Sequence, residues 1–190
     1  MTQADAGIKV EVEDVVHEIE PSELTVLHLN ELRKHGMSYV GDALAGKQLV
    51  AESEMAMRAM IHQIESGALT FEDEFIGTGC TAVLDYLAAN FSKKTDAVMA
   101  HYKATQKQLK KAGWTVYSSQ AHAEGIDLSH HENLIIVNAG YSGAKHLQRR
   151  ERLVNMAQER DRIVVHHITV KGGISPDVYG SVSNKRDFNL

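Results

Sequence analysis

The sequence predicts an α+β fold, with a helix-rich N-terminal part that includes an edge strand, and then a small mixed sheet with a strand-helix-strand unit. Two observations support this prediction. Apolar residues recur at helical spacing in most segments up to residue 112, whereas β-type runs dominate from about 113 to 172. The 190 residues, 43% of them apolar, are enough for one compact domain. A Rossmann-like three-layer sandwich ranks second, because few strands are evident.

The N-terminal part contains one predicted strand and four predicted helices. Residues 8–13 alternate apolar and charged side chains, which is typical of a half-buried edge strand. A proline and a serine begin a helix over about 21–35, and a glycine ends it. The spacing of apolar residues then predicts helices over about 43–66, 80–91 and 95–112.

The second part alternates between strands and a helix. Residues 114–118 are a short strand candidate, and a polar, histidine-rich loop follows over 119–133. The apolar run at 134–137 predicts a buried strand, and a charged helix at about 144–160 separates it from a strand at 163–170. A helix of this length permits a parallel crossover between the two strands.

The composition indicates an ordinary globular protein. We expect one domain over residues 1–190, with a helical part at about 20–112, a mixed-sheet part at about 113–172 and an irregular tail at 173–190. Cys80 is the one cysteine, which excludes an internal disulfide and indicates a reducing compartment. The N-terminus lacks the pattern of a signal peptide, and no apolar run approaches the roughly 18 residues of a membrane span. We therefore expect a cytoplasmic protein, or one incorporated into a particle assembled there, with no membrane partner.

Charge is divided unevenly between the two halves of the chain. Residues 1–92 have 16 acidic and 5 basic side chains, whereas residues 93–190 have 9 acidic and 15 basic ones. Such asymmetry bears on partners rather than on fold. The candidate basic interface consists of Lys103, Lys107, Lys110, Lys111, Arg149, Arg150 and Arg152. The candidate acidic interface consists of Glu11, Glu13, Asp14, Glu72, Asp73 and Glu74.

The leading functional hypothesis from the sequence is a non-enzymatic structural or assembly subunit. Complementary acidic and basic faces would join copies of the chain head to tail, into a ring or a tube. A head, neck or tail protein of a viral particle would fit this description, with copies of itself or another assembly subunit as the partner. No cofactor is expected on this hypothesis.

A second hypothesis is a small α/β enzyme that binds a nucleotide or a phosphate at the turn formed by residues 140–143. This turn lies between a predicted strand and a predicted helix, where backbone N–H groups can hold an anion. Gly140, Ser142 and Gly143 are the candidate anion-binding residues. Ser142, His166 and His167 are the candidate catalytic residues, although position 144 is alanine where a nucleophile elbow has glycine.

A third hypothesis is a nucleic-acid-associated protein that contacts phosphates through the two basic helices, with nucleic acid a less favoured partner than another protein.

Two further motifs are weak. His122, His130 and His131 in the histidine-rich loop are metal candidates without a known ligand spacing. Residues 77–82 match the glycine pattern of a dinucleotide-binding turn, but the acidic run at 72–74 just before them would repel phosphate.

Overall fold

A five-stranded parallel sheet lies at the centre of the computed structural model, which describes residues 11–40, 46–119, 128, 130–147 and 162–189. Its strands follow the order β1-β9-β8-β6-β7, and every neighbouring pair is parallel. The strands are β1 (Glu11–Ile19), β6 (Ala97–Ala100), β7 (Thr115–Ser118), β8 (Leu134–Val137) and β9 (Arg162–Val170). The predicted mixed α and β fold with an N-terminal edge strand is confirmed, but that strand was expected over 8–13, and the sheet is wholly parallel where a small mixed sheet was expected.

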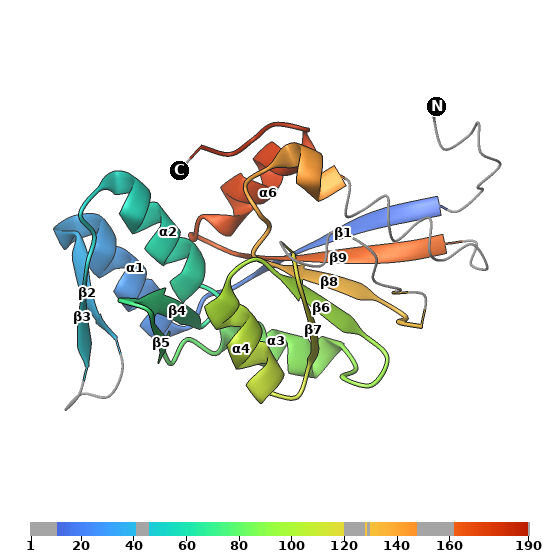
Figure 1. Cartoon of the computed structure of the whole chain (residues 1–190), viewed down its shortest axis with the longest axis horizontal. Coiled ribbons are helices and arrows are strands. Elements are labelled where there is room, and N and C mark those ends of the chain that lie inside the picture. The colour runs from blue at the N-terminus through green and yellow to red at the C-terminus, as the bar shows by residue number, and fades with distance from the viewer. Residues whose placement is uncertain (1–10, 41–45, 120–127, 129, 148–161, 190) are drawn as a thin grey trace.

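Helices lie on both sides of this sheet (Figure 1). On one side, α3 (Ala82–Asn90) and α4 (Lys103–Lys111) pack their apolar side chains against alternate residues of β6, β8 and β9. On the other side lie α6 (Ser175–Ser183) and a helical segment at 143–147. Because both faces are covered, β8 is a continuous apolar run with no alternation.

The remaining elements form a second core at one end of the sheet (Figure 1). Helices α1 (Glu23–His35) and α2 (Glu54–Ile64) pack there with two antiparallel hairpins. The hairpins are β2 (Met37–Val40) with β3 (Lys47–Val50), and β4 (Ala68–Phe71) with β5 (Glu74–Gly77). As predicted, α1 begins after Ser22, whose side chain accepts a hydrogen bond from the Thr25 N–H, and ends at Gly36.

Three predicted elements differ from the structure. The helix expected over 43–66 is α2 alone, because residues 47–50 form β3. The helix expected over 95–112 is α4 alone, because residues 97–100 form β6, and a strand buried on both faces shows no periodicity of its own. The tail expected to be irregular contains α6. Most of the helix predicted over 144–160 lies outside the described residues.

No helix within the described ranges combines the length and the apolar character that a membrane span requires.

Candidate functional site

The strand order reverses between β6 and β8, and this reversal locates the candidate site. From β6 the chain continues outward to β7 at one edge, whereas β8 lies on the opposite side of β6 and is followed by β9. In open parallel sheets, ligands bind outside the carboxyl ends of the strands at such a switch point. The segments that leave these two carboxyl ends are residues 101–102 and the turn 140–143.

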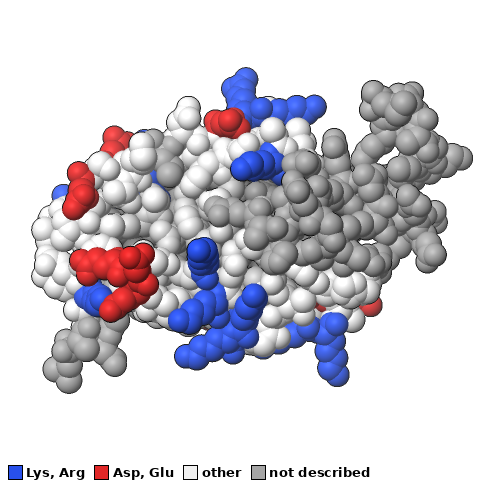
Figure 2. All heavy atoms as spheres, viewed as in Figure 1, with Lys and Arg blue, Asp and Glu red and all other residues white. Residues whose placement is uncertain are grey.

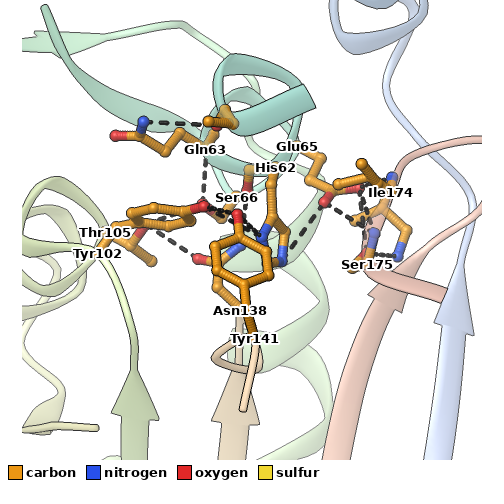
Figure 3. Close-up of polar contacts among 12 residues, drawn as sticks. His62, Gln63, Glu65, Ser66, Tyr102, Thr105, Asn138, Tyr141, Ile174 and Ser175 are labelled. Carbon is orange, nitrogen blue, oxygen red and sulfur yellow. Dashed lines mark hydrogen bonds and ion pairs between the residues drawn. The ribbon is translucent and has the colours of Figure 1, made fainter. Parts of the chain in front are cut away.

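A cluster of polar aromatic side chains fills this position (Figure 3). His62 comes from α2, Tyr102 follows β6 and Tyr141 follows β8. The Tyr141 hydroxyl lies 2.9 Å from His62 Nδ1, the Tyr102 hydroxyl lies 3.2 Å from the same nitrogen, and the two hydroxyls contact each other. Each hydroxyl can donate to Nδ1 of a neutral His62 ring or accept from it, so the three groups form one hydrogen-bonded set.

A second set of hydrogen bonds joins the end of α2 to α4 and to the residue that follows β8. Asn138, which follows β8 with a left-handed φ of 54°, donates from its amide nitrogen to the His62 carbonyl over 2.7 Å. Its side-chain oxygen accepts from Thr105 of α4 over 3.0 Å, and Thr105 in turn contacts Ser66 at 2.9 Å. All four residues are buried, so α2, α4 and β8 are held in one arrangement around the site.

Glu65 extends the network from α2 to the start of α6 (Figure 3). Its carboxyl group accepts hydrogen bonds of 3.1 Å from the backbone N–H groups of Ile174 and Ser175, and another of 3.1 Å from the Ser175 hydroxyl. His62 Nε2 faces the same carboxyl group, with 3.8 Å between Nε2 and Glu65 Oε1. Glu65 therefore satisfies the free N–H groups at the N-terminus of α6.

Burial determines the protonation states in this cluster. It lowers the pKa of His62 to about 3, with His101 adding a smaller effect in the same direction. It raises the pKa of Glu65 to about 8, against the opposing effect of the hydrogen bonds from Ser175 and Ile174. Burial also raises the pKa of Tyr141 to about 12, and raises that of Tyr102 as well. At neutral pH the histidine and both tyrosines are uncharged, so they act as hydrogen-bonding groups rather than as acids or bases.

The turn at 140–143 follows β8 and contributes Tyr141 to this cluster. As predicted, it connects a buried strand to a helical segment, and the His146 N–H donates to the Ser142 carbonyl over 3.0 Å. The Gly143 N–H donates to a carboxylate oxygen of Asp187 over 2.8 Å. The Ser142 hydroxyl has no hydrogen-bond partner within the described part of the chain. Anion binding by Gly140, Ser142 and Gly143 remains a prediction.

The two histidine candidates have hydrogen-bond partners other than Ser142. His166 and His167 lie on opposite faces of β9, level with Ile135 and Ile136 near the middle of β8. His166 bonds with His17 over 2.8 Å, and burial lowers its pKa, with the neighbouring His17 adding to the effect. His167 bonds with Asp14 over 3.0 Å. No bond between Ser142 and either ring occurs among the described residues.

The predicted metal candidates are not assembled into a site that the structure describes. The rings of His130 and His131 lie 4.0 Å apart, and His131 Nε2 is 3.0 Å from the Tyr117 hydroxyl. His122 lies outside the described residues. Among the residues with described positions, no three His, Cys, Asp or Glu side chains are grouped to hold a metal ion.

Several acidic interface candidates have partners within the chain. Glu13 pairs with Arg162, and Glu74 pairs with Lys47. Asp14 pairs with His167. The side chain of Glu11 lies outside the described set, while Glu72 and Asp73 are exposed in the β4–β5 turn.

The basic candidates fall into two groups. The four lysines, Lys103, Lys107, Lys110 and Lys111, are exposed on α4. In Figure 2 they lie on the same face of the molecule as the acidic β4–β5 turn, beside it rather than opposite. Arg149, Arg150 and Arg152 lie outside the described residues.

Sequence reasoning located the turn 140–143 but missed its neighbours. His62, Glu65 and Tyr102 come from segments that only the sheet order and the second core bring to the turn. One signal was available in the sequence: His62 and Glu65 lie three residues apart at the apolar end of a predicted helix. Because buried polar side chains need hydrogen-bond partners, this pair indicated a polar cluster at that end.

Comparison with known proteins gives a fold likeness. No protein-family model matches the chain, and no curated protein matches its sequence. Among solved structures, the chain is similar to the "Crystal structure of the C-terminal part of Fun30 ATPase domain", with a TM-score of 0.57 and 10% sequence identity. The similarity covers 95% of this chain and 91% of that chain. At this identity it shows the fold alone.

The hypothesis of a non-enzymatic assembly subunit, in a ring, a tube or a viral particle, is wrong. The chain shares its fold, along 95% of its length, with part of an ATPase domain. The contacts give a physical reason against the assembly hypothesis. Glu13, Asp14 and Glu74 were expected to contact a second subunit, but each pairs with a residue of the same chain. The fold agrees better with the second hypothesis, which assumed a small α/β enzyme.

Proposed function

We propose that this chain is a nucleotide-binding α/β domain that receives the phosphates of its ligand at the turn formed by residues 140–143. The main supporting observation is the position of this turn at the switch point of a parallel sheet, where such folds bind their ligands. The fold likeness to part of an ATPase domain supports a nucleotide as the ligand class.

The groups around the turn suit a phosphate. Ser142 offers a hydroxyl without a partner in the described residues, and the Gly143 N–H already holds a carboxylate, which is an anion of similar hydrogen-bonding character. Lys145 is exposed in the helical segment that follows, and Lys103 is exposed at the start of α4, next to Tyr102. The neutral cluster behind the turn fixes the position of Tyr141 through His62.

The role we assign is binding and positioning of the nucleotide. A hydrolytic centre would need a nucleophile and a base in contact. Ser142 and the two β9 histidines do not provide such a pair among the residues that the structure describes.

Binding of ADP and pyrophosphate to the purified chain, measured by isothermal titration calorimetry, tests this proposal. Ser142→Ala should weaken binding about ten- to a hundredfold, because a hydrogen bond to a charged group contributes roughly 1.5–3 kcal/mol. Ser181→Ala is the matched control, since this serine lies on α6 and its side chain has no described hydrogen bond. The proposal fails if neither compound binds at millimolar concentration to the full chain or to a folded chain that ends at residue 184, or if Ser142→Ala binds as well as the control.

A second candidate function is contact with nucleic acid through α4. Its four lysines span about one quadrant of the helix surface, and Figure 2 shows basic side chains gathered at this place. None of them is paired with a carboxylate within the described residues. Such a surface can bind phosphates without reading sequence.

Fluorescence anisotropy with a short DNA duplex, at about 50 and 200 mM salt, tests this second candidate. Replacing Lys107 and Lys110 with Gln should flatten the salt dependence by about 0.9 log units per lost phosphate contact. Replacing the exposed Lys34 and Lys94 with Gln is the matched control. Equal behaviour of the two double variants, or binding that is insensitive to salt, contradicts this function.

A further inference from the structure

The last residues of the chain fold back over the candidate site. After α6, the segment at residues 185–189, which we name the C-terminal strap, runs across the turn 140–143. The Phe188 N–H donates to the Tyr141 carbonyl over 2.8 Å, and the Asp187 carboxylate accepts from the Gly143 N–H over 2.8 Å. The rings of Phe188 and Tyr141 stack with 6.1 Å between their centroids.

The strap and the turn fit closely. A Cβ atom on Gly143 would lie 2.7 Å from the carbonyl carbon of Lys185 and 2.9 Å from the backbone nitrogen of Arg186, so only glycine lets the two backbones approach this far. The Arg186 N–H donates to the Ser181 carbonyl over 3.1 Å, which directs the strap back from the end of α6. The contact is therefore a specific arrangement of the chain end.

Most of the strap is exposed to solvent, so it can detach from the turn by a local opening. Residues 185–187 and 189 are exposed, and Phe188 is half-buried. Its described contacts with the turn are two hydrogen bonds, one ring stack and the close approach at Gly143. Phe188 also packs against the second core, so lifting the strap uncovers one partly buried apolar side chain. Such a local opening costs less free energy than unfolding of the core.

We propose that the C-terminal strap is an internal competitor of the ligand, in which the Asp187 carboxylate occupies the backbone N–H that a nucleotide phosphate would otherwise use. This inference rests on the proposed function of the turn 140–143. The closed strap covers Tyr141 and Gly143, so a ligand binds only to the fraction of molecules in which the strap has lifted. The apparent affinity is reduced by that fraction.

Removal of the strap tests the proposal. A chain that ends at residue 184, and the full chain with Asp187→Ala, should both bind ADP more tightly than the unmodified chain, by about tenfold if the strap is open one-tenth of the time. Asn189→Ala is the control, because this exposed residue belongs to the strap and has no described bond with the turn. Calorimetry gives the affinities, and circular dichroism shows that each variant is folded.

The outcomes separate the two proposals. If the unmodified chain binds ADP and both variants bind it with the same or lower affinity, the strap is not a competitor and the proposed function survives. If the unmodified chain and both folded variants fail to bind ADP and pyrophosphate, the proposed function fails, and the competition falls with it.

Limited trypsin digestion provides a second measurement in the unmodified chain. Lys185 and Arg186 are cleavage sites inside the strap, and cleavage requires the segment to leave the turn. Saturating ADP should speed cleavage at these two residues and leave cleavage at the exposed Lys34 unchanged. Protection of Lys185 and Arg186 by ADP would mean that the strap closes over the ligand, which overturns the competition.

Discussion

Two buried side chains, Glu65 and His62, make the stability of this protein depend on pH in opposite directions. Glu65 has a pKa of about 8 in the folded state, so between pH 4.5 and 8 the folded chain holds a proton that the unfolded chain has lost. The stability from this group therefore falls as the pH rises through that window. His62, with a folded pKa of about 3, lacks a proton that the unfolded chain binds between pH 3 and 6.5, so its effect is lost as the pH falls.

The two effects cancel between about pH 4.5 and 6.5 and act alone outside that range. Glu65→Gln should therefore remove the fall in stability between pH 6.5 and 8, even though an amide at this position caps α6 less well and lowers stability at every pH. Urea unfolding at several pH values from 5.5 to 8.5 measures the slope, with the exposed Glu52→Gln as control. If the stability of Glu65→Gln fell with pH as steeply as that of the unmodified chain, the pH dependence would not come from Glu65.

Space at single glycines gives a second prediction. A Cβ atom on Gly173 would fall directly on Glu65 Oε2, whereas a Cβ atom on Gly180, in α6, would have no described heavy atom within 4 Å beyond the backbone of its own helix. Gly173→Ala should displace the Glu65 carboxyl group from three hydrogen bonds and lower the free energy of unfolding by about 2 kcal/mol or more. Gly180→Ala should be neutral or stabilising by up to about 1 kcal/mol. Thermal unfolding compares them, and equal losses would show that Glu65 can move freely.

At the scale of elements, the start of α1 gives a third prediction. The Ser22 hydroxyl lies 3.2 Å from the Thr25 N–H and 2.8 Å from the Thr25 hydroxyl. Ser22→Ala should lower the free energy of unfolding by about 1 kcal/mol, because it leaves an N–H group of the first turn without its partner. Denaturant unfolding measures this loss against Ser181→Ala on α6. A Ser22→Ala variant as stable as that control would mean that water replaces the cap without cost.

Elements with local signals could be predicted, and elements defined by their neighbours could not. Helix α1 has a serine at its start and a glycine at its end, and β8 is a short apolar run bounded by polar residues. Strand β6 is buried on both faces and so shows no alternation of its own, and its pairing with β7 and β8 is not visible in the local sequence. Likewise β3 is fixed by its pairing with β2. The α and β content was therefore predictable, while the number of strands in the sheet was not.

The same distinction holds for the candidate site. The turn at 140–143 was predictable, since it lies between a strand and a helical segment with glycines at both ends. His62 and Tyr102 reach it from α2 and from the end of β6, and nothing near them in sequence indicates a shared partner. The strap was not predictable either, because its contacts with the turn join residues 44 and 47 positions apart.

At the scale of the whole molecule, the pairing of β1 with β9 joins the two halves of the chain. Residue 11 lies beside residue 162, and the register continues through nine pairs to residues 19 and 170. The acidic strand from the first half therefore lies against a strand from the basic half, with Glu13 beside Arg162 and Asp14 beside His167. The uneven charge in sequence is partly compensated within one molecule, although an exposed pair such as Glu13 and Arg162 adds little stability.

The pairing of β1 with β9 gives a fourth prediction. If β1 and β9 form one cooperative unit, their hydrogen-bonded amides should exchange with solvent at similar free energies of opening, close to that of global unfolding. Native-state hydrogen exchange followed by NMR measures these values residue by residue. Exchange in β1 at a much lower free energy than in β9 would mean that the first strand detaches by itself, and would contradict the unit.

The position of β1 also affects the order in which the molecule forms during synthesis. The ribosome makes this strand before its partner β9, which emerges 151 residues later, a delay of roughly 8 to 30 s at ordinary rates of translation. Throughout this interval the apolar side chains of β1 lack the strand against which they pack. The acidic residues between them keep the waiting segment soluble and oppose premature pairing with other nascent chains.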